Sequence, residues 1–391
     1  MAEQHEKALV PQIRFTGFTD PWEQRKLGEL YKEVSEKNDL TYGRDRIISV
    51  AHMYFNPVVY VTEDDYLKTY NVMRLGDIAF EGNRSKNFAH GRLVENTIGD
   101  GIVSHVFKVF RPIQPFDLMY WKYSINNEKA MKDVLTRSTK ASTMMHELVA
   151  KDFLNEEIAV PSLEEQRQIG AFFDRLDSLI TLHQRKHDKL CVLKKSMLDK
   201  MFPKGGSLYP EIRFAGFTDP WEQRKVQDVA DRFDNLRIPV AANLRVHGKT
   251  PYYGANGIQD YVDGFTHDGE FVLVAEDGAN DLKNYPVKCV NGRIWVNNHA
   301  HVLQGKAGIA DNSFLAFAIS QSDIESLLVG GGRAKLNAET LMSIEFRLPC
   351  LQEQHQIGEY LTRLDHLITL HQRKLELLRN IKKSMLDKMF V

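Results

Sequence analysis

The sequence has few cysteines and no long apolar run. Its three cysteines, Cys191, Cys289 and Cys350, are far apart among 391 residues and form no CxxC pair. This spacing excludes a disulfide scaffold and a zinc ribbon, and it is typical of a reducing cytoplasm. No stretch approaches the roughly 18 apolar residues that a membrane helix requires, and the N-terminal segment lacks the apolar centre of a signal peptide. We therefore expect a cytoplasmic protein that does not enter a membrane.

The chain also has almost no net charge. It contains 51 basic and 52 acidic residues, which gives a formal net charge of −1. This balance argues against a protein that coats nucleic acid regardless of sequence, because such binding depends on many cations attracting the phosphates. Any nucleic-acid binding must use local patches or positive charge from a partner. Hydrophobic residues at 43% with 13 prolines indicate folded domains. The length suits about two or three of them.

Two segments occur twice in the same order, and they determine the organisation of the chain. Ile13–Lys26 returns as Ile212–Lys225 with a single difference. Pro161–Phe202 returns as Pro349–Phe390, and 28 of the 42 aligned positions are identical. The segments between these repeats share almost no sequence. A constant frame with different contents is what we expect of one scaffold that holds two recognition units with different targets. Drift after a duplication would have changed the frame as well.

The repeats divide the chain into six segments. We expect an N-terminal tail at 1–12, a first globular domain at 13–160, a long helix at 161–203, a linker at 204–211, a second globular domain at 212–348 and a second long helix at 349–391. Five segments have the apolar, β-branched texture of strands: Val72–Phe80, Gly101–Phe110, Glu270–Ala275, Arg293–Val296 and His299–Leu303. The expected fold class is α/β, with two globular domains separated by two long antiparallel helices in a pseudo-twofold duplication.

Each copy of the longer repeat predicts one uninterrupted helix. Neither proline nor glycine occurs in Ala171–Phe202 or Glu359–Phe390, and apolar residues recur every seven residues. A helix of about 38 residues is about 57 Å long, too long for burial inside one small domain, so we expect the two helices to pack together. The residues expected at helix or partner interfaces are Ile169, Phe173, Leu176, Ile180, His183, Ile357, Leu361, Leu364, Ile368 and His371.

The apolar stripe on each helix is wider than a two-helix seam requires. The flanking positions include Phe173, Ile180, Leu361 and Ile368. We expect part of this surface to contact the helices of a partner; the alternative is that these residues cover the ends of the variable domains. His183 and His371 occupy equivalent positions within the stripe. Because no carboxylate or thiol lies at ligand spacing, each is better interpreted as an interior histidine than as a metal ligand.

Loops in both domains carry side chains suited to reading DNA. In the first domain these are Asn83, Arg84, Lys86 and Asn87, in a loop after a strand-like segment. In the second domain they are Tyr252, Tyr253, Asn256, Asn280, Arg333 and Lys335. Arginine pairs with guanine and asparagine with adenine through two hydrogen bonds, and basic residues in a glycine-rich segment suit a phosphate. The alternative is ordinary turn chemistry, because Asn, Asp and Gly are common in turns.

The sequence contains no recognisable catalytic or metal-binding motif. Asn56–Val59 lacks the second proline of the Asn-Pro-Pro-aromatic motif, which holds a flipped base for amino methylation. Gly330–Asn337 is rich in glycine but lacks the spacing of a nucleotide-binding loop. His299 and His301 lie two residues apart without an evident third ligand. We therefore expect no catalytic residue, metal or cofactor in this chain.

The repeats carry a resemblance to a known family. The strings LEEQRQIG and LDSLITLHQRK, their second copies, and PWEQRK at the start of each domain resemble the specificity subunit of type I restriction-modification enzymes. The resemblance covers essentially the whole chain. It implies two target-recognition domains, each reading one half of a bipartite, asymmetric site in double-stranded DNA, with the helices setting the spacer. It also implies that the subunit has no enzymatic activity of its own.

The same resemblance implies the partners. They are two methyltransferase subunits, which carry S-adenosylmethionine, and restriction subunits, which use ATP and magnesium to translocate and cleave DNA. Two other classes stay open at this point. A DNA methyltransferase fused to its recognition domains would need an S-adenosylmethionine loop that the sequence lacks. A coiled-coil adaptor without DNA binding would explain the helices, but it would not explain two dissimilar domains in one duplicated frame.

Overall fold

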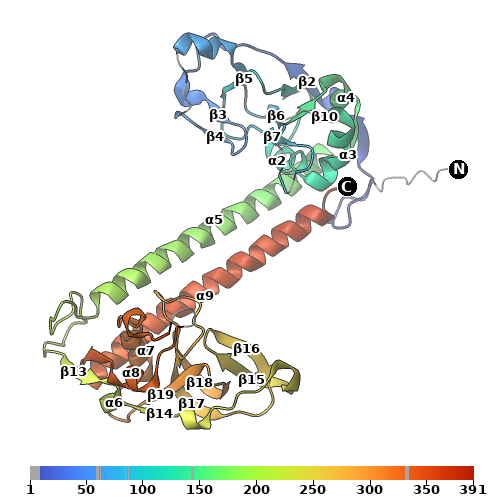
Figure 1. The fold of residues 1–391 in the computed structure, drawn as a ribbon. Helices are drawn as coiled ribbons and strands as arrows, with labels where there is room; N and C mark the ends of the chain where they lie inside the picture. The colour runs from blue at the N-terminus through green and yellow to red at the C-terminus, as the bar shows by residue number, and fades with distance from the viewer. Residues whose placement is uncertain are drawn as a thin grey trace. The chain divides into compact units, whose positions relative to one another are not determined.

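A computed structural model describes residues 9–58, 61, 63–83, 85–86, 88–141, 145–330 and 334–391. The chain forms two compact units, shown in Figure 1. The first unit comprises Met1–His183 and Lys374–Val391, and the second comprises Gln184–Arg373. Each unit thus contains one copy of the shorter repeat, one variable segment and a part of both long helices.

The two long helices match the expectation from the heptad pattern. Helix α5 (Leu163–Lys200) and helix α9 (Leu351–Lys388) each contain 38 residues, and each begins two residues after a proline. Helix α5 begins and α9 ends in the first unit, whereas α9 begins and α5 ends in the second, so the helices run antiparallel in each unit. No helix in the described part of the chain is long and apolar enough to cross a membrane.

One ion pair between the helices occurs twice. In the first unit, Lys382 Nζ lies 2.6 Å from Asp177 Oδ1. In the second unit, Lys194 Nζ lies 2.5 Å from Asp365 Oδ1. The two aspartates occupy the same position of the helix repeat, and so do the two lysines. The internal duplication therefore gives each unit an equivalent contact between the helices.

The first unit is built around a four-stranded antiparallel sheet in the order β2-β9-β6-β7. Its strands are β1 (Glu23–Lys26), β2 (Tyr31–Val34), β3 (Ile48–Ser49), β4 (Tyr54–Phe55), β5 (Asn71–Met73), β6 (Ile78–Glu81), β7 (Arg92–Glu95), β8 (Gly101–Val103), β9 (Val109–Pro112), β10 (Thr139–Ala141), β11 (His146–Leu148) and β12 (Glu157–Val160). Its shorter helices are α1 (Leu27–Leu30), α2 (Leu118–Ser124), α3 (Glu128–Ser138) and α4 (Ala150–Asn155). Strand β1 of the repeated frame pairs with β12, which leads directly into α5.

The second unit contains a six-stranded sheet in the order β14-β19-β17-β18-β15-β16. Its strands are β13 (Glu222–Lys225), β14 (Ala230–Arg232), β15 (His247–Gly254), β16 (Gly257–Val262), β17 (His267–Ala275), β18 (Val287–Val296), β19 (Ala300–Gly305) and β20 (Glu345–Leu348). Its shorter helices are α6 (Val226–Val229), α7 (Asn312–Ser320) and α8 (Ala338–Ser343). Strand β13 pairs with β20 as β1 pairs with β12, so the frame is the same in both units. The expected α/β fold class is confirmed.

Two of the five expected strands are wrong in extent. Val72–Phe80 is divided between β5 and β6, because Gly76 adopts a φ of +85° and turns the chain between them. Gly101–Phe110 is divided between β8 and β9 by a turn in which Phe107 N–H donates to the Ser104 carbonyl. The other three expected segments fall on β17, β18 and β19, although β19 begins one residue after His299. The apolar and β-branched residues correctly indicated strands, but they did not indicate the turns within the first two segments.

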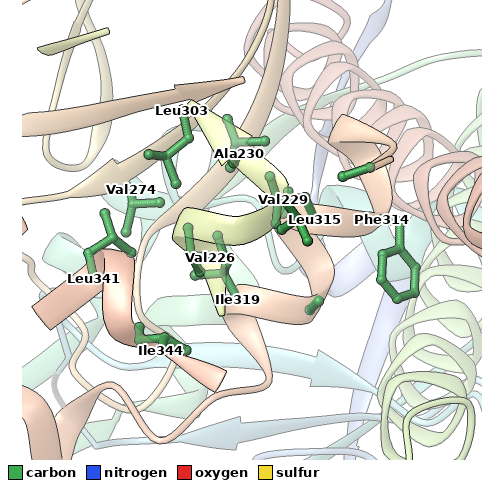
Figure 2. Packing of buried hydrophobic residues seen from close by; sticks show 14 of the residues in the cluster. Val226, Val229, Ala230, Val274, Leu303, Phe314, Leu315, Ile319, Leu341 and Ile344 are labelled. Carbon is green, nitrogen blue, oxygen red and sulfur yellow. The ribbon is translucent and has the colours of Figure 1, made fainter. Parts of the chain in front are cut away.

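The core of the second unit combines residues of the repeated frame with variable residues. Figure 2 shows Val226 and Val229 of α6 packed with Leu315 and Ile319 of α7 and with Leu341 of α8. Helix α6 directly follows the second copy of the shorter repeat, whereas α7 belongs wholly to the variable segment. The variable segment and the repeated frame therefore share one hydrophobic core.

Each variable domain docks on its long helix through the same three residue types. In the first unit, Asp117 caps α2 by accepting from Tyr120 N–H at 2.8 Å, and Gln166 of α5 accepts from Asp117 N–H at 3.2 Å. Gly170 lies directly against this cap. In the second unit, Asp311, Gln354 and Gly358 repeat the arrangement at α7 and α9. The two variable segments share this anchor although their sequences differ.

Replacing Gly170 by alanine is expected to destabilise the first unit. An added Cβ would lie 2.4 Å from Asp117 Oδ1 and 2.7 Å from Tyr120 N. Such overpacking costs about 1–3 kcal/mol, and this outweighs the gain of about 1 kcal/mol in helix propensity. Thermal unfolding measures the change. The opposite substitution at the exposed neighbour, Ala171→Gly, should cost only about 1 kcal/mol. A more stable Gly170→Ala protein would show that the cap does not dock closely.

Candidate nucleic-acid interface

Two of the loops singled out in the second domain are joined by one side chain. Asn256 follows β15, and its Nδ2 donates to the Gly278 carbonyl at 2.8 Å. Its Oδ1 accepts from Asn280 N–H at 2.9 Å. The carboxamide of Asn256 therefore connects the loop after β15 to the loop after β17. This is a positioning role, which leaves Asn280 as the outward-facing asparagine of the pair.

The third loop joins the same end of the sheet. Leu336 N–H donates to the Glu276 carbonyl at 2.7 Å, and Val329 and Lys335 exchange two backbone hydrogen bonds of 2.9 Å. The turn between β18 and β19 lies here as well, since Glu276 N–H donates to the His299 carbonyl at 2.9 Å. Segments far apart in the sequence thus form one continuous surface of loops.

A network of charges lies beneath these loops. Glu276 accepts from Arg237 Nη1 at 2.6 Å, and Lys335 Nζ lies 2.9 Å from its other carboxylate oxygen. Burial would raise the pKa of Glu276, but the bonds from Lys335 and Arg237 outweigh it and the pKa is lowered from its ordinary value. Buried His301 lies 2.7 Å from Asp234 Oδ2, and its other ring nitrogen lies 2.9 Å from the Leu336 carbonyl. These ion pairs and hydrogen bonds fix the positions of the residues from which the loops extend.

The same cluster contains a group that could hold a cation. Ligand atoms of Asp234, Glu276 and His301 lie within 4.8 Å of one another. The carboxylate of Glu276 is already paired with Arg237 and Lys335, and a divalent ion would add two more positive charges beside them. We therefore interpret the cluster as an ion-pair network. His299, considered above as a partner of His301, instead forms an ion pair with Asp277.

The expected base contacts of two tyrosines are wrong. Tyr252 and Tyr253 are only 1% and 7% exposed, so their rings cannot stack on bases. The hydroxyl of Tyr252 accepts from Val240 N–H at 2.9 Å, and the Arg245 guanidinium lies 4.1 Å from its ring centroid. Lys335, expected at a phosphate, is paired with Glu276. The expected phosphate contact at Arg333 lies outside the described residues.

The first domain presents its loop over a similar ion pair. Glu81 ends β6, and its Oε2 accepts from Arg92 Nε at 2.7 Å. Arg92 Nη2 donates to the Ala51 carbonyl at 2.5 Å, as Arg237 Nη1 of the second domain donates to the Ala300 carbonyl at 2.9 Å. In both domains a glutamate at the end of a central strand, or one residue after it, therefore holds an arginine against the backbone of a neighbouring segment.

The expected readers of the first domain are placed only in part. Asn83 and Lys86 are exposed in the loop after β6, and Asn83 Nδ2 lies 3.4 Å from Glu81 Oε1. Arg84 and Asn87 lie outside the described residues. Sequence reasoning missed the hairpin between β3 and β4, where His52 and Tyr54 are exposed beside Ala51. No motif marks this hairpin, which is connected to Glu81 at the start of the loop through Arg92.

Six of the ten residues expected at helix or partner interfaces are buried within their own units. Ile169, Phe173, Leu176, Ile357, Leu361 and Leu364 are all buried, and Ile180, His183, Ile368 and His371 are partly buried. The partner contact expected at Phe173 and Leu361 is therefore wrong. Phe173 packs 5.1 Å from the ring of Tyr123 on α2, and Leu361 lies in the core of the second unit. At these two positions the apolar stripe packs against the variable domains, which is the alternative that the sequence left open.

A groove in the second unit remains open beside the helices. Its volume is about 1130 Å³, and it is bounded by α5, α7 and α9. Ile368, Leu370 and Arg373 of α9 line one side, and Phe317 of α7 lines another. Leu370 is 52% exposed. The groove therefore combines apolar side chains with charged groups of both signs.

The two variable domains, their common frame and the long helices correspond to a known family. The model of the type I restriction modification DNA specificity domain matches residues 19–191 and 218–380. The chain belongs to this family. Each match begins within the shorter repeat and extends into a long helix, so one complete family domain contains one variable segment. The family is that of the recognition subunits of type I restriction-modification, and not that of the catalytic subunits.

Individual relatives support the assignment. A type I restriction enzyme specificity subunit of Haemophilus influenzae is 44% identical over 146 residues, which cover 37% of this chain and 38% of that protein. The MjaVIII specificity subunit of Methanocaldococcus jannaschii is 23% identical across 94% of this chain and 92% of that protein. The crystal structure of a type I S subunit from M. genitalium shares the fold, with a TM-score of 0.61 at 14% identity over 98% of this chain and 99% of that chain.

Proposed function

We propose that the chain recognises double-stranded DNA within a type I restriction-modification complex, and that each variable domain reads one half of a bipartite, asymmetric site. One observation carries the proposal: two domains of unrelated sequence present polar loops over a glutamate–arginine pair on the same duplicated frame. The half-sites should differ because the loops differ. The long helices would set the number of unread base pairs between them. This role places the chain in the cytoplasm, with the DNA.

The chemistry would come from partners. We propose two methyltransferase subunits, which carry S-adenosylmethionine, and restriction or translocase subunits, which use ATP and magnesium. The chain itself would bind none of these cofactors. The groove lined by Ile368 and Leu370 supports a docking role for the helices, because it is open, exposes apolar side chains and is lined in part by the repeated segments. With a net charge of −1, the chain would also depend on its partners for general attraction to DNA.

Selection of bound sites from random DNA tests the proposal. The chain is assembled with its methyltransferase subunits, and bound DNA is recovered at physiological salt and sequenced. We expect two short, different sequences separated by a spacer of constant length and free composition. Recovery of a single uninterrupted site would favour the alternative that the chain is the recognition part of a fused DNA methyltransferase. Absence of any selected sequence would favour an adaptor that does not bind DNA.

Leu370→Asp is expected to prevent methyltransferase binding while leaving the chain folded. Leu370 is 52% exposed in the groove, so a carboxylate there costs the free chain little but would be desolvated under a partner helix. Co-purification with the methyltransferase subunits measures binding, and thermal unfolding measures the fold. The matched control is Val192→Asp, which is 70% exposed on α5 and does not line the groove. Equal loss of binding in both variants would remove the groove from the interface.

A further inference from the structure

We propose that Asn298 contacts the edge of an adenine in the half-site read by the second domain, next to Asn280. The inference rests on the proposed function and adds to it a residue that determines specificity. Asn298 lies in the short turn between β18 and β19 and is exposed. No motif includes it. In the sequence, only the Asn-Asn pair between two strand-like segments indicates a turn at this place.

The turn is held firmly against the loop after β17. Asn297 N–H donates to the Tyr253 carbonyl at 3.0 Å, and its Oδ1 accepts from His299 N–H at 2.8 Å. The His299 carbonyl accepts from Glu276 N–H at 2.9 Å, and its ring pairs with Asp277. Asn298 is therefore flanked on both sides by residues with defined partners, although its own side chain points into no core. Because its backbone is already held in place, less conformational entropy is lost when the side chain of Asn298 binds a ligand.

The asparagines at this end of the sheet divide into two kinds. The carboxamides of Asn256 and Asn297 are hydrogen-bonded within the protein, to the Gly278–Asn280 loop and to His299 with Gln259 respectively. Among the described residues, Asn280 and Asn298 are exposed, and neither carboxamide has an internal hydrogen bond. An asparagine carboxamide offers one donor side and one acceptor side, which match N7 and N6 of adenine in the major groove. The carboxamides of Asn280 and Asn298 are thus available for bases, whereas those of Asn256 and Asn297 hold the loops in place.

The closest competing element is the charged cluster below the loops. The charges of Lys335 and Arg237 are balanced by Glu276 and Asp234, so this cluster has no net charge with which to select a base. The buried tyrosines of β15 offer no exposed ring. The carboxamides of Asn280 and Asn298 combine access, a backbone held by neighbouring loops and two-sided hydrogen bonding. They sit on two different connections of the sheet, after β17 and after β18.

Site selection with the assembled complex tests the inference. Asn298→Ala should relax one position of the second half-site, where preference for adenine falls by about five- to 150-fold, the range expected for a lost two-bond base contact. The first half-site and the spacer should not change. Asn298→Asp, which suits the turn but has no donor, should lose the same preference. The matched control is Asn291→Ala, an exposed asparagine on β18 that pairs across the sheet with Glu270.

The outcomes separate this inference from the function on which it rests. An unchanged second half-site in both Asn298 variants, with a bipartite site in wild type, would overturn the inference and leave the proposed function intact. A loss of affinity that is equal on all DNA sequences would also overturn it, because that is the signature of a phosphate contact. If the wild-type complex selects no bipartite site, the proposed function itself fails. If Asn298→Ala also lowers the melting temperature, the half-site selected by Asn298→Asp tests the inference instead, because aspartate suits the turn.

Discussion

Replacing Arg14 by methionine is expected to lower the free energy of unfolding of the first unit by about 3–5 kcal/mol. Arg14 donates from Nε and Nη2 to the two carboxylate oxygens of Glu165 at 2.7 and 2.8 Å. The side chain of Glu165 has no exposed surface. Without the guanidinium, a buried carboxylate loses its counter-charge, which costs more than the absence of the whole pair. Chemical denaturation measures the loss, and hydrogen exchange assigns it to one unit.

Three variants show whether burial is the reason. Arg213→Met removes the equivalent pair of the second copy and should destabilise the second unit instead. Combining Arg14→Met with Glu165→Leu should recover much of the loss, since no charge stays buried. Arg25→Met breaks an exposed pair with Glu29 at 3.2 Å and should cost less than about 1 kcal/mol. A loss at Arg25 as large as that at Arg14 would contradict the argument.

The first unit should also become less stable as the pH rises, because of Glu95. This residue of β7 is 3% exposed, and neither carboxylate oxygen has a hydrogen-bond partner among the described residues. Burial, reinforced by the charge of Asp117, raises the pKa of Glu95 from 4.5 to about 10. Between these values the folded state holds a proton that the unfolded chain has released. Each pH unit in that window therefore removes up to about 1.4 kcal/mol of stability.

Glu95→Gln isolates this effect. The amide cannot ionise, so the variant should be about as stable as wild type near pH 5 and more stable by up to a few kcal/mol near pH 8. Urea denaturation at the two pH values measures the difference. Glu147→Gln, at an exposed position on β11 of the same unit, should keep the wild-type pH dependence. If Glu95→Gln declines with pH as steeply as wild type, other groups carry the dependence.

The long helices and the duplicated frame could be predicted because their signals are local or repeated. A run without proline or glycine and a seven-residue apolar spacing specify a helix wherever it lies. The use of individual positions depends on contacts that the sequence does not display. Phe173 and Leu361 looked like partner-facing residues because both flank the seam, yet each packs on its own variable domain. The heptad pattern shows that a face is covered, but not by which element.

The loops show the same distinction. Their residue types correctly indicated where polar connections gather, and the structure brings the three loops of the second domain together. It could not be predicted that Asn256 holds two loops together while Asn298 stays exposed, since both are asparagines in turn-like segments. Tyr252 and Tyr253 follow each other on β15 and are both buried, because Tyr253 packs in a hydrophobic cluster with Phe271 while Tyr252 is covered by the segment that contains Val240 and Arg245. Alternation along one strand would have exposed one of them.

The aspartate caps at Asp117 and Asp311 set a condition on how this protein can acquire new specificities. A foreign segment that enters the frame by recombination must supply an acidic residue at the start of a helix, where Gln166 or Gln354 and the adjacent helix glycine can receive it. Beyond that anchor and its core contacts, the loops can diversify without disturbing the frame. Selection for a stable fold and selection for a new target then act on different positions of the same segment.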